Sequence, residues 1–390
     1  MELKKGKFNL ETVMVISIAH LIHDVFTSFL APLMPMLIDK FNLSYFSGSA
    51  LNVARKTPSL LSLILGSVIN KLDDDKIHYL IVLTPLTTSF LMSLLGILPS
   101  YFVLLLVLLL VGFSSTIFHI IAPSMIKEIS GKQVGKGVSF YQLGGEAARS
   151  IGPLVILGFL AKFELEKSYF LIIAGGLVSL LLYLKIKDIN LHHIFENSSD
   201  NDVSLKKVIK TNYKFILNIG GIKFFWNLTK IALTLFLPTY LKTVKGVSIW
   251  VSGGALSVLQ LAGAGGTYCG GIISDKYGRK TIIFLLMICT IFAMGFFSIS
   301  QGIILLPLII ILGFCIYAMN PIILALVQEK GSDYLIELNS FYKTVSFVSS
   351  TMATLLIGKM GDIMGLGLVY KLIPGCLVLS LALILNLNLE

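Results

Sequence analysis

Residues 271–280 read Gly-Ile-Ile-Ser-Asp-Lys-Tyr-Gly-Arg-Lys and form a short charged segment between two long apolar runs. The chain has 390 residues, of which 55% are apolar and only 13% are charged. A soluble domain carries about 25% charged residues, so this composition excludes a disordered chain, a soluble enzyme and an ordinary nucleic-acid binder. The formal net charge is +10, and an anionic membrane surface attracts such basic residues as a nucleic acid does. We therefore interpret the positive charge as an adaptation to the membrane, and we expect no nucleic-acid partner.

Working outward from this segment, the sequence contains twelve apolar runs that are each long enough to cross a membrane. A spanning helix needs about 20 apolar residues, and lipid offers no partner to a free peptide group, so each run is predicted to be a helix. The expected fold is an all-α membrane protein with twelve transmembrane helices. Their approximate limits are 13–39, 47–70, 77–97, 100–128, 137–163, 168–187, 214–242, 248–274, 280–298, 302–328, 334–358 and 365–388.

A polar stretch at 188–212 divides these runs into two groups of six. We therefore predict two pseudo-symmetric six-helix bundles, residues 1–187 and 213–390, joined by a cytoplasmic linker. Most Lys and Arg residues that flank the spans fall on the side of the N-terminus and the linker, and cytoplasmic loops carry this excess. The expected location is the cytoplasmic (inner) membrane, with both termini in the cytoplasm.

The charged segment 271–280 lies between the eighth and ninth spans, and a weaker copy, Gly66 to Lys76, lies between the second and third. The pattern resembles the signature loop of the major facilitator superfamily, whose members are secondary transporters with two six-helix halves. The resemblance implies a conformational latch, in which an acid meets a basic partner or a helix N-terminus and the first glycine permits close helix contact. The latch residues would be Gly271, Asp275, Gly278, Arg279 and Lys280. In the weaker copy, Asn70 replaces the Asp. An ordinary charged turn is the alternative.

A second resemblance covers parts of the first half. The segments that carry it are His20-Leu-Ile-His23-Asp24, Leu30-Ala-Pro32-Leu-Met-Pro35, Gly112 to His119, and Gln142-Leu-Gly144-Gly145 with Gly152-Pro153. They are similar to the fosmidomycin resistance family, which implies proton-driven export of small molecules. That family has His-x-x-Asn-Asp on its first helix, so His23 departs from it. Its acid after the histidine of the fourth span is absent here, and Glu146 is the acid that we expect at a depth similar to that of His119.

Away from the ends of the predicted spans, the acids are Asp24 and Glu146. His20, His23 and Asp24 have the spacing i, i+3, i+4, so they share one helix face, and Asp24 lies near mid-depth. The protonation of such a carboxylate responds to desolvation and to neighbouring cations. We therefore predict that Asp24, Glu146, His20 and His119 couple transport to protons. A structural carboxylate is one alternative, and a metal site formed by His20, His23 and Asp24 is another. No resident metal or other cofactor is expected.

Basic residues outnumber acids inside the spans, where they are Arg55, Lys56, Arg149, Lys223, Lys230 and Lys343. A charge at the bilayer centre costs about 2.5–3.5 kcal/mol on insertion scales, so it usually faces a cavity or a partner. The excess predicts a small anionic solute such as a phosphonate, an organic phosphate or a carboxylate. The predicted substrate ligands are Arg55, Arg149, Lys223, Asn227, Lys230, Lys343, Gln260, Tyr317 and Asn320. As alternatives, Glu146 and Arg149 simply pair, and the lysines contact carbonyl groups or water.

The sequence thus predicts a monomeric, proton-coupled antiporter that exports a small organic anion by alternating access. Two alternatives keep the fold: a proton-coupled importer of an organic acid or of a carboxylate-type metal chelate such as a siderophore, and a divalent metal ion transporter. A membrane-embedded enzyme is disfavoured because the sequence contains neither HExxH nor GxSxG, and a nucleotide-driven pump because it contains no GxxxxGK[ST] loop.

Overall fold

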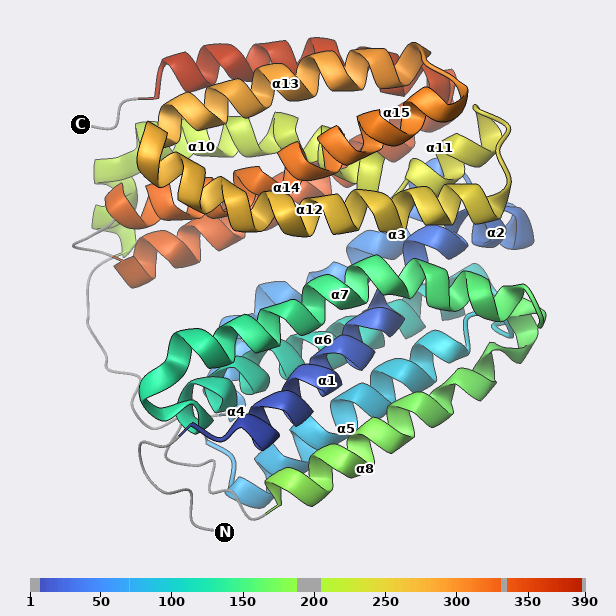
Figure 1. Cartoon of the computed structure of the whole chain (residues 1–390), viewed down its shortest axis with the longest axis vertical. Coiled ribbons are helices and arrows are strands. Elements are labelled where there is room, and N and C mark those ends of the chain that lie inside the picture. Colours follow the sequence, from blue (N-terminus) through green and yellow to red (C-terminus); the bar gives the residue numbers. More distant parts are fainter. Residues whose placement is uncertain (1–7, 70, 188–204, 331–334, 388–390) are drawn as a thin grey trace. The chain divides into compact units, whose positions relative to one another are not determined.

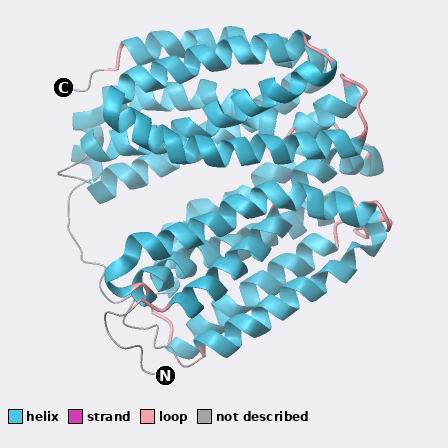
Figure 2. Cartoon of the chain, viewed as in Figure 1, coloured by secondary structure: helices cyan, strands magenta, loops and turns pink. Residues whose placement is uncertain are grey.

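The computed structural model describes residues 8–69, 71–187, 205–330 and 335–387, and all regular elements within these ranges are helices (Figure 2). The α-helices are α1 (Leu10–Thr27), α2 (Leu30–Phe41), α3 (Tyr45–Lys56), α4 (Ser62–Ile69), α5 (Asp74–Ser93), α6 (Tyr101–Ile129), α7 (Val134–Leu160), α8 (Ile172–Ile186), α10 (Leu205–Thr234), α11 (Leu237–Thr243), α12 (Ile249–Tyr277), α13 (Arg279–Ile299), α14 (Leu305–Lys330) and α15 (Leu335–Leu385). Short 3-10 turns are η1 (Thr57–Leu61), η2 (Gly131–Gln133), η3 (Leu165–Leu171) and η4 (Gly302–Ile304).

Turns and kinks divide the described helices into twelve consecutive segments, one for each predicted span. These segments are 10–41, 45–69, 74–93, 101–129, 134–160, 165–186, 205–243, 249–277, 279–299, 302–330, 335–364 and 366–385. The last two form the continuous helix α15, which is interrupted at Gly365, where φ is +78°. Within the described ranges, 8 helices are long and apolar enough to cross a membrane by length and composition alone. The predicted all-α membrane fold is therefore confirmed.

The chain forms two compact units. Unit 1 comprises Met1–Leu30 and Leu51–Asp200, and unit 2 comprises Ala31–Ala50 and Asn201–Glu390. Residues 31–50, which the sequence assigned to the first bundle, thus associate with unit 2. Of the predicted linker 188–212, residues 188–204 lie outside the described ranges, and α10 begins at Leu205, inside the rest of it.

In unit 1, α1 packs along α7, and α5 packs between α6 and α8 (Figure 1). The core at one end of this unit is formed by apolar side chains from α1, α5, α6 and α8, such as Ile16, Ile81, Phe118 and Leu182. Helices in lipid associate through close packing and small residues, because lipid tails are as apolar as leucine. The tight fit of α7 on α1 is an example, since it depends on glycines.

Three glycines of α7 face α1. A Cβ at Gly144 would meet the carbonyl of Ser17, a Cβ at Gly145 would meet the ring of His20, and a Cβ at Gly152 would meet Ser28. Glycine is therefore required along this face so that the two helices can approach each other. The consequence for function is that polar side chains of α1 come within hydrogen-bonding distance of α7.

In unit 2, α12 packs against α14, α10 packs against α15, and α13 contacts both α14 and α15. The segment 31–50 is attached to this unit by polar contacts. The carboxylate of Asp362 accepts hydrogen bonds from the backbone N–H groups of Tyr45 (2.6 Å) and Phe46 (3.0 Å), and thereby caps the start of α3. Nζ of Lys242 lies 2.7 Å from a carboxylate oxygen of Asp39.

Candidate functional site

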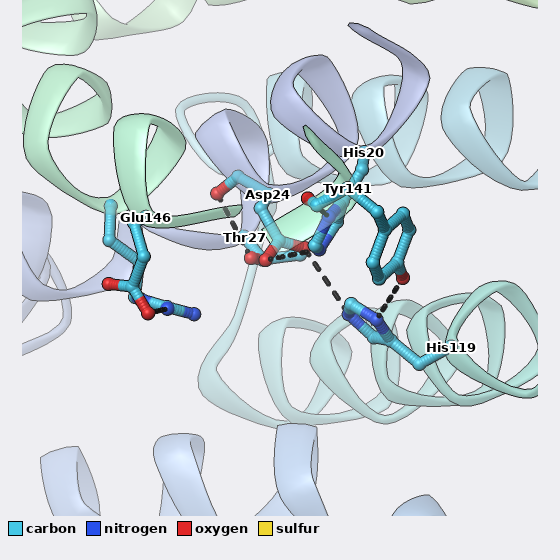
Figure 3. A network of polar contacts seen from close by, with 7 residues as sticks. His20, Asp24, Thr27, His119, Tyr141 and Glu146 are labelled. Carbon is cyan, nitrogen blue, oxygen red and sulfur yellow. Dashed lines mark hydrogen bonds and ion pairs between the residues drawn. The ribbon is translucent and has the colours of Figure 1, made fainter. Parts of the chain in front are cut away.

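The candidate proton site of unit 1 lies where α1, α6 and α7 meet (Figure 3). α1 supplies His20 and Asp24, α6 supplies His119, and α7 supplies Tyr141. The spacing i, i+4 puts His20 and Asp24 on one face of α1. Because Gly145 has no side chain, α7 comes close enough for the rings of His20 and Tyr141 to stack, with their centroids 4.0 Å apart.

The carboxylate of Asp24 is shared by two histidines. Nε2 of His20 lies 3.3 Å from Oδ2 of Asp24, and Nε2 of His119 lies 3.3 Å from Oδ1. Tyr141 holds both rings from the other side. Its backbone carbonyl contacts Nδ1 of His20 at 2.8 Å, and its hydroxyl contacts Nδ1 of His119 at 3.2 Å. The structure thus brings together the predicted residues His20, Asp24 and His119.

These contacts define where hydrogens must lie. A carbonyl oxygen only accepts, so Nδ1 of His20 carries a hydrogen and donates it to Tyr141. Nε2 of the same ring faces a carboxyl oxygen, and this contact is favourable only with one further proton between the two atoms. His119 is different, because the hydroxyl that it contacts can donate or accept. The contact between His20 and Asp24 can therefore hold a proton between the two side chains, and the Tyr141 hydroxyl can serve Nδ1 of His119 either as donor or as acceptor.

The cluster is open at one end. The exposed fraction of the His119 side chain is 39%, whereas it is 7% for His20 and 9% for Asp24. A proton that reaches the buried pair from outside unit 1 can therefore pass through His119. Chemically, the arrangement is a buried proton acceptor with an exposed imidazole relay.

The same three side chains also form the one group within the described residues that could hold a metal ion. One ligand atom from each of His20, Asp24 and His119 lies within 4.8 Å of the others. His23, which the sequence included as a candidate ligand, is not part of this group. It is fully buried, stacks on Phe118 with centroids 4.6 Å apart, and neither ring nitrogen has a hydrogen-bond partner among the described residues.

Glu146 lies apart from this cluster (Figure 3) and pairs with Arg149 one turn further along α7. The sequence placed Glu146 at a depth similar to that of His119, but the acid that contacts His119 is Asp24. The reason is rotation about α7, because Glu146 follows Tyr141 by five residues and so points about 140° away from it. Both members of the Glu146–Arg149 pair are half-buried.

Arg55 lies in the last turn of α3 and is half-buried. Its Nη2 donates to Oδ1 of Asn52 at 3.2 Å, while its Nε is buried without a hydrogen-bond partner among the described residues. Gly112 of α6 lies against the backbone carbonyl of Arg55, where a Cβ would collide. Unit 1 thus contains two half-buried guanidinium groups, those of Arg55 and Arg149, and Arg149 is held in its ion pair with Glu146.

Unit 2 gathers most of the other predicted substrate ligands between α10 and α14. Lys223 is only 6% exposed, and its Nζ donates to Oδ1 of Asn320 at 3.3 Å. The same ammonium lies 5.5 Å from the ring centroid of Tyr342. Both of these partners are neutral, so neither of them compensates the charge of Lys223.

One to two turns further along α10, Lys230 lies over the ring of Tyr317, with Nζ 5.3 Å from the centroid. The Tyr317 hydroxyl donates to Oε1 of Gln260 at 2.5 Å. Asn227 lies between the two lysines and is 5% exposed, and its Nδ2 has no hydrogen-bond partner among the described residues. Lys343, by contrast, is exposed on α15 and is not part of these contacts.

The charged loop forms a network inside unit 2. Arg279 contacts Asp275 (Nη1 to Oδ1, 2.5 Å) and Glu329 at the end of α14 (Nη2 to Oε1, 2.8 Å). Gly278 has φ of +88°, a conformation that favours glycine, and ends α12. Lys280 donates to the carbonyl of Leu385, the last residue of α15 (2.8 Å), and to that of Leu387 just after it (3.0 Å).

The close helix contact expected at Gly271 occurs elsewhere on α12. A Cβ at Gly271 would meet no atom within 4 Å, whereas a Cβ at Gly270 would meet Ala318 of α14. The two positions differ by about 100° around the helix, which a sequence pattern does not resolve. In the first-half copy of the loop, Asn70 lies outside the described residues. Lys76 there donates to Asp73 at 2.8 Å, and this hydrogen bond raises the pKa of Lys76.

Sequence reasoning missed Tyr141 and Glu329. Tyr141 directly precedes the Gln142-Leu-Gly144-Gly145 segment, so its position next to a glycine pair was the available signal. Glu329 ends an apolar run 50 residues from its partner Arg279, and no local pattern links the two.

A helical membrane fold with ionisable side chains inside the spans is typical of secondary transporters. A sequence profile described as the Major Facilitator Superfamily matches residues 16–354, and the chain belongs to this family. It is 23% identical over 370 residues to the fosmidomycin resistance protein of Escherichia coli (strain K12), covering 92% of this chain and 88% of that protein. The resemblance to the superfamily and to fosmidomycin resistance proteins is therefore confirmed.

Solved structures show the same fold at low identity. The chain superimposes with a TM-score of 0.80 on a bacterial homologue of the human lysosomal transporter Spinster in an inward-facing and occupied conformation, at 14% identity, covering 97% of this chain and 96% of that one. A D-xylose–proton symporter gives a TM-score of 0.66 at 16% identity, covering 95% and 96%. The protein is thus a multi-pass membrane protein of a transporter family.

Proposed function

We propose that this protein exports a small anionic organic compound across the cytoplasmic membrane in exchange for protons, by alternating access. The observation that carries the proposal is the Asp24 carboxylate of unit 1, buried and shared by one enclosed and one exposed histidine. A group of this kind gains and loses a proton as its access to water changes. No enzymatic step is needed, and the protein acts as a monomer with both termini in the cytoplasm.

The basic residues support an anionic solute. Lys223 is buried against two neutral partners, and an unpaired buried charge is costly, so an anion that enters unit 2 is stabilised there. Arg55 and Arg149 offer guanidinium groups in unit 1. Phosphonates, organic phosphates and carboxylates fit these donors, whereas cationic drugs do not.

Proton uptake is proposed to act on two pairs. A proton on the His20–Asp24 pair neutralises it, and His119 relays that proton because it is the exposed member. Protonation of Glu146 releases Arg149 from its ion pair, so that the guanidinium can bind the anion. The relative named for fosmidomycin resistance supports export, because a transporter lowers the internal concentration of a toxic compound by moving it out.

The test uses the full chain in liposomes that contain a pH-sensitive dye, with a panel of organic phosphates, phosphonates, polycarboxylates and cationic drugs. We expect proton movement with anions but not cations, in the direction opposite to the anion. Asp24→Asn should reduce this signal by at least about tenfold, because the amide holds no exchangeable acidic proton. Glu164→Gln is the matched control, since it changes an exposed acid of the same unit.

Three results would overturn parts of the proposal. Proton movement in the same direction as the anion would indicate an importer of an organic acid or of a carboxylate-type chelate. A signal only with cations would mean that the basic residues are structural. An unchanged signal in Asp24→Asn would remove this carboxylate from proton coupling.

The second candidate function is transport of a divalent metal ion. The observation that favours it is that ligand atoms of His20, Asp24 and His119 lie within 4.8 Å of one another. Two imidazole nitrogens and a carboxylate oxygen are common ligands of zinc and related ions. The test measures flux of Zn²⁺ or Mn²⁺ in the same liposomes. If the metal moves without any organic anion and His119→Gln abolishes this flux, the transported solute is a metal ion and not the proposed anion.

A further inference from the structure

We propose that the first turn of α3 is a catch, which holds segment 31–50 against the rest of unit 2 and must open in every transport cycle, with Asp362 as its main polar contact. The inference rests on the proposed function, because alternating access requires the two units to move relative to each other. It adds a positioning residue, Asp362, that is neither a predicted substrate ligand nor a predicted proton ligand.

The course of the chain puts this segment under tension when the units move. Segment 31–50 packs in unit 2, although the chain on both sides of it belongs to unit 1. The second boundary, between residues 50 and 51, falls inside the continuous helix α3 (Tyr45–Lys56). The last turn of α3 is fixed in unit 1, where the carbonyl of Arg55 lies against Gly112 of α6. Because a continuous helix keeps its backbone hydrogen bonds, a movement of unit 1 pulls on the first turn of α3.

The polar contacts that hold segment 31–50 lie at the surface. The exposed carboxylate of Asp362 accepts hydrogen bonds from the backbone N–H groups of Tyr45 (2.6 Å) and Phe46 (3.0 Å). The ion pair of Asp39 with Lys242 is also accessible, with exposed side-chain fractions of 67% and 36%. Water can replace the partner in each of these contacts, and exposed ion pairs contribute little stability. Both contacts can therefore open and close at a small net cost.

The surface of α15 under α3 is formed by two glycines. A Cβ at Gly358 would lie 2.2 Å from Oγ of Ser49 and 2.7 Å from the carbonyl oxygen of Tyr45, and a Cβ at Gly361 would lie 3.0 Å from the Tyr45 ring. Glycine is therefore what allows α3 to lie directly on α15 at these points. Since neither position carries a side chain, α3 can leave this face without pulling interlocked side chains apart.

Ser49 reports whether the catch is closed. Its side chain is 0% exposed, and its Oγ donates to the carbonyl of Thr354 on α15 at 2.8 Å. Ser49 follows Tyr45 by one turn, so it lies on the same face of α3. When the first turn of α3 leaves α15, this position becomes accessible to water.

The first experiment measures this accessibility without any transported solute. Ser49→Cys is placed in the full chain in lipid nanodiscs, with the four native cysteines replaced by alanine, and its rate of reaction with a hydrophilic maleimide is measured. We expect Asp362→Ala to raise this rate by at least about fivefold, because it increases the population with an open catch. Asp362→Asn should raise it less, since its amide oxygen can still accept one of the two N–H groups.

Ser168→Cys is the matched control for this experiment. Ser168 is another buried serine, 2% exposed, and it lies in unit 1, where its Oγ donates to the carbonyl of Ser93. Its rate of reaction should not depend on residue 362. General unfolding of the Asp362→Ala variant would instead raise the rates at both positions.

The second experiment keeps Asp362 and closes the catch chemically in liposomes. Asp39→Cys and Lys242→Cys replace a pair whose charged groups lie 2.7 Å apart, and a short reagent with two thiosulfonate groups joins them through cleavable disulfides. We expect anion-driven proton movement to fall by at least about tenfold and to recover after reduction, because the open state is then excluded. Glu11→Cys with Lys185→Cys is the matched control, since it joins an exposed ion pair between two helices of unit 1. Its cross-link should leave transport unchanged.

Either of two results would overturn the catch. One is a reaction rate at position 49 that is the same with Asp and Ala at 362, and the other is full transport by the chain cross-linked between 39 and 242. The proposed function is judged separately. If anions move protons equally well with and without this cross-link, anion transport stands and the catch is wrong. If no anion moves protons in any variant, the proposed function fails, and the reaction rates at position 49 decide whether the catch exists.

Discussion

Asp24 is the residue on which the proposed coupling depends, and its surroundings explain why a carboxylate is tolerated inside a bundle. Nε2 atoms of His20 and His119 each lie 3.3 Å from one of its two oxygens, so its charge is shared with side chains of two helices, α1 and α6. A lone carboxylate at such a depth would be expensive, whereas one that shares a proton with an imidazole is nearly neutral as a unit. The cost of burial is thus offset by the same contacts that make the group titratable.

Tyr141→Phe tests the relay through His119. The variant removes the hydroxyl that contacts Nδ1 of His119, but it keeps the backbone carbonyl that holds His20. The lost hydrogen bond is worth about 0.5–1.5 kcal/mol, so we expect the proton-coupled rate to fall about threefold to tenfold with little change in melting temperature. The measurement is the rate of dye-reported proton movement as a function of pH. A rate and pH profile identical to wild type would exclude a role for this hydroxyl.

Some residues of the His20–Asp24–His119 cluster could be predicted from the sequence. The sequence identified His20, Asp24 and His119 because ionisable residues inside a span are expensive and therefore informative. It did not identify Asp24 as the partner of His119, since that contact depends on how α1 and α6 are rotated about their axes. Tyr141 was missed for a similar reason: its role comes from a backbone carbonyl and a hydroxyl that only packing places near two histidines.

At the scale of helices, the close fit of α7 on α1 is what assembles the proton site. Gly145→Ala should disturb it, because the new Cβ would lie 2.5 Å from Cε1 of His20. We expect the ring to move away from Asp24 and proton-coupled transport to fall by at least about tenfold, with a loss of stability of about 1–3 kcal/mol from overpacking. Thermal unfolding and transport assays on the same preparation measure both effects.

Gly158→Ala is the control for this prediction. Gly158 lies on the same helix, and a Cβ there would meet nothing within 4 Å. The alanine should therefore be neutral or slightly stabilising, because alanine is favoured over glycine inside helices. Equal effects of the two substitutions would show that the helix rather than the His20 contact is responsible.

A further prediction for the helices concerns Asp362, which caps the start of α3. The carboxylate of Asp362 accepts the N–H groups of Tyr45 and Phe46 and so satisfies two donors at the start of that helix. Asp362→Ala should lower the free energy of unfolding by about 0.5–2 kcal/mol, whereas Asp362→Asn, which can still accept, should have a smaller effect. Chemical denaturation in detergent would check this order. An alanine variant as stable as wild type would mean that these donors find another partner.

For the whole molecule, the number and limits of the helical segments were predictable because apolar length and the polar interruptions determine them. The segments 101–129 and 302–330, for example, lie within a few residues of the predicted spans 100–128 and 302–328. The assignment of residues 31–50 was not predictable, because it depends on contacts such as that of Asp362 with Tyr45, which are far apart in the sequence.

Membrane orientation is the prediction that belongs to the whole chain. From the distribution of Lys and Arg we expect the termini and residues 188–212 to lie in the cytoplasm and the turn after α11 to lie outside. Alkaline phosphatase inserted at Gly246 should therefore be active, and the same enzyme inserted within 188–204 should be inactive. Fluorescent-protein fusions to either terminus should be bright, since these fold in the cytoplasm. If the phosphatase is active within 188–204 and inactive at Gly246, the chain has the opposite orientation in the membrane, and the proposed direction of transport must be reversed with it.

The position of the His20 ring over Gly145 also has an evolutionary consequence. A Cβ at 145 and an imidazole at 20 compete for one space, so the two positions are not free to change independently. Among diverged descendants of this chain, a side chain at 145 should occur together with a smaller residue at 20, and a histidine at 20 with glycine at 145. A library randomised at both codons and selected for transport would record that covariation directly, and independent variation of the two positions would contradict it.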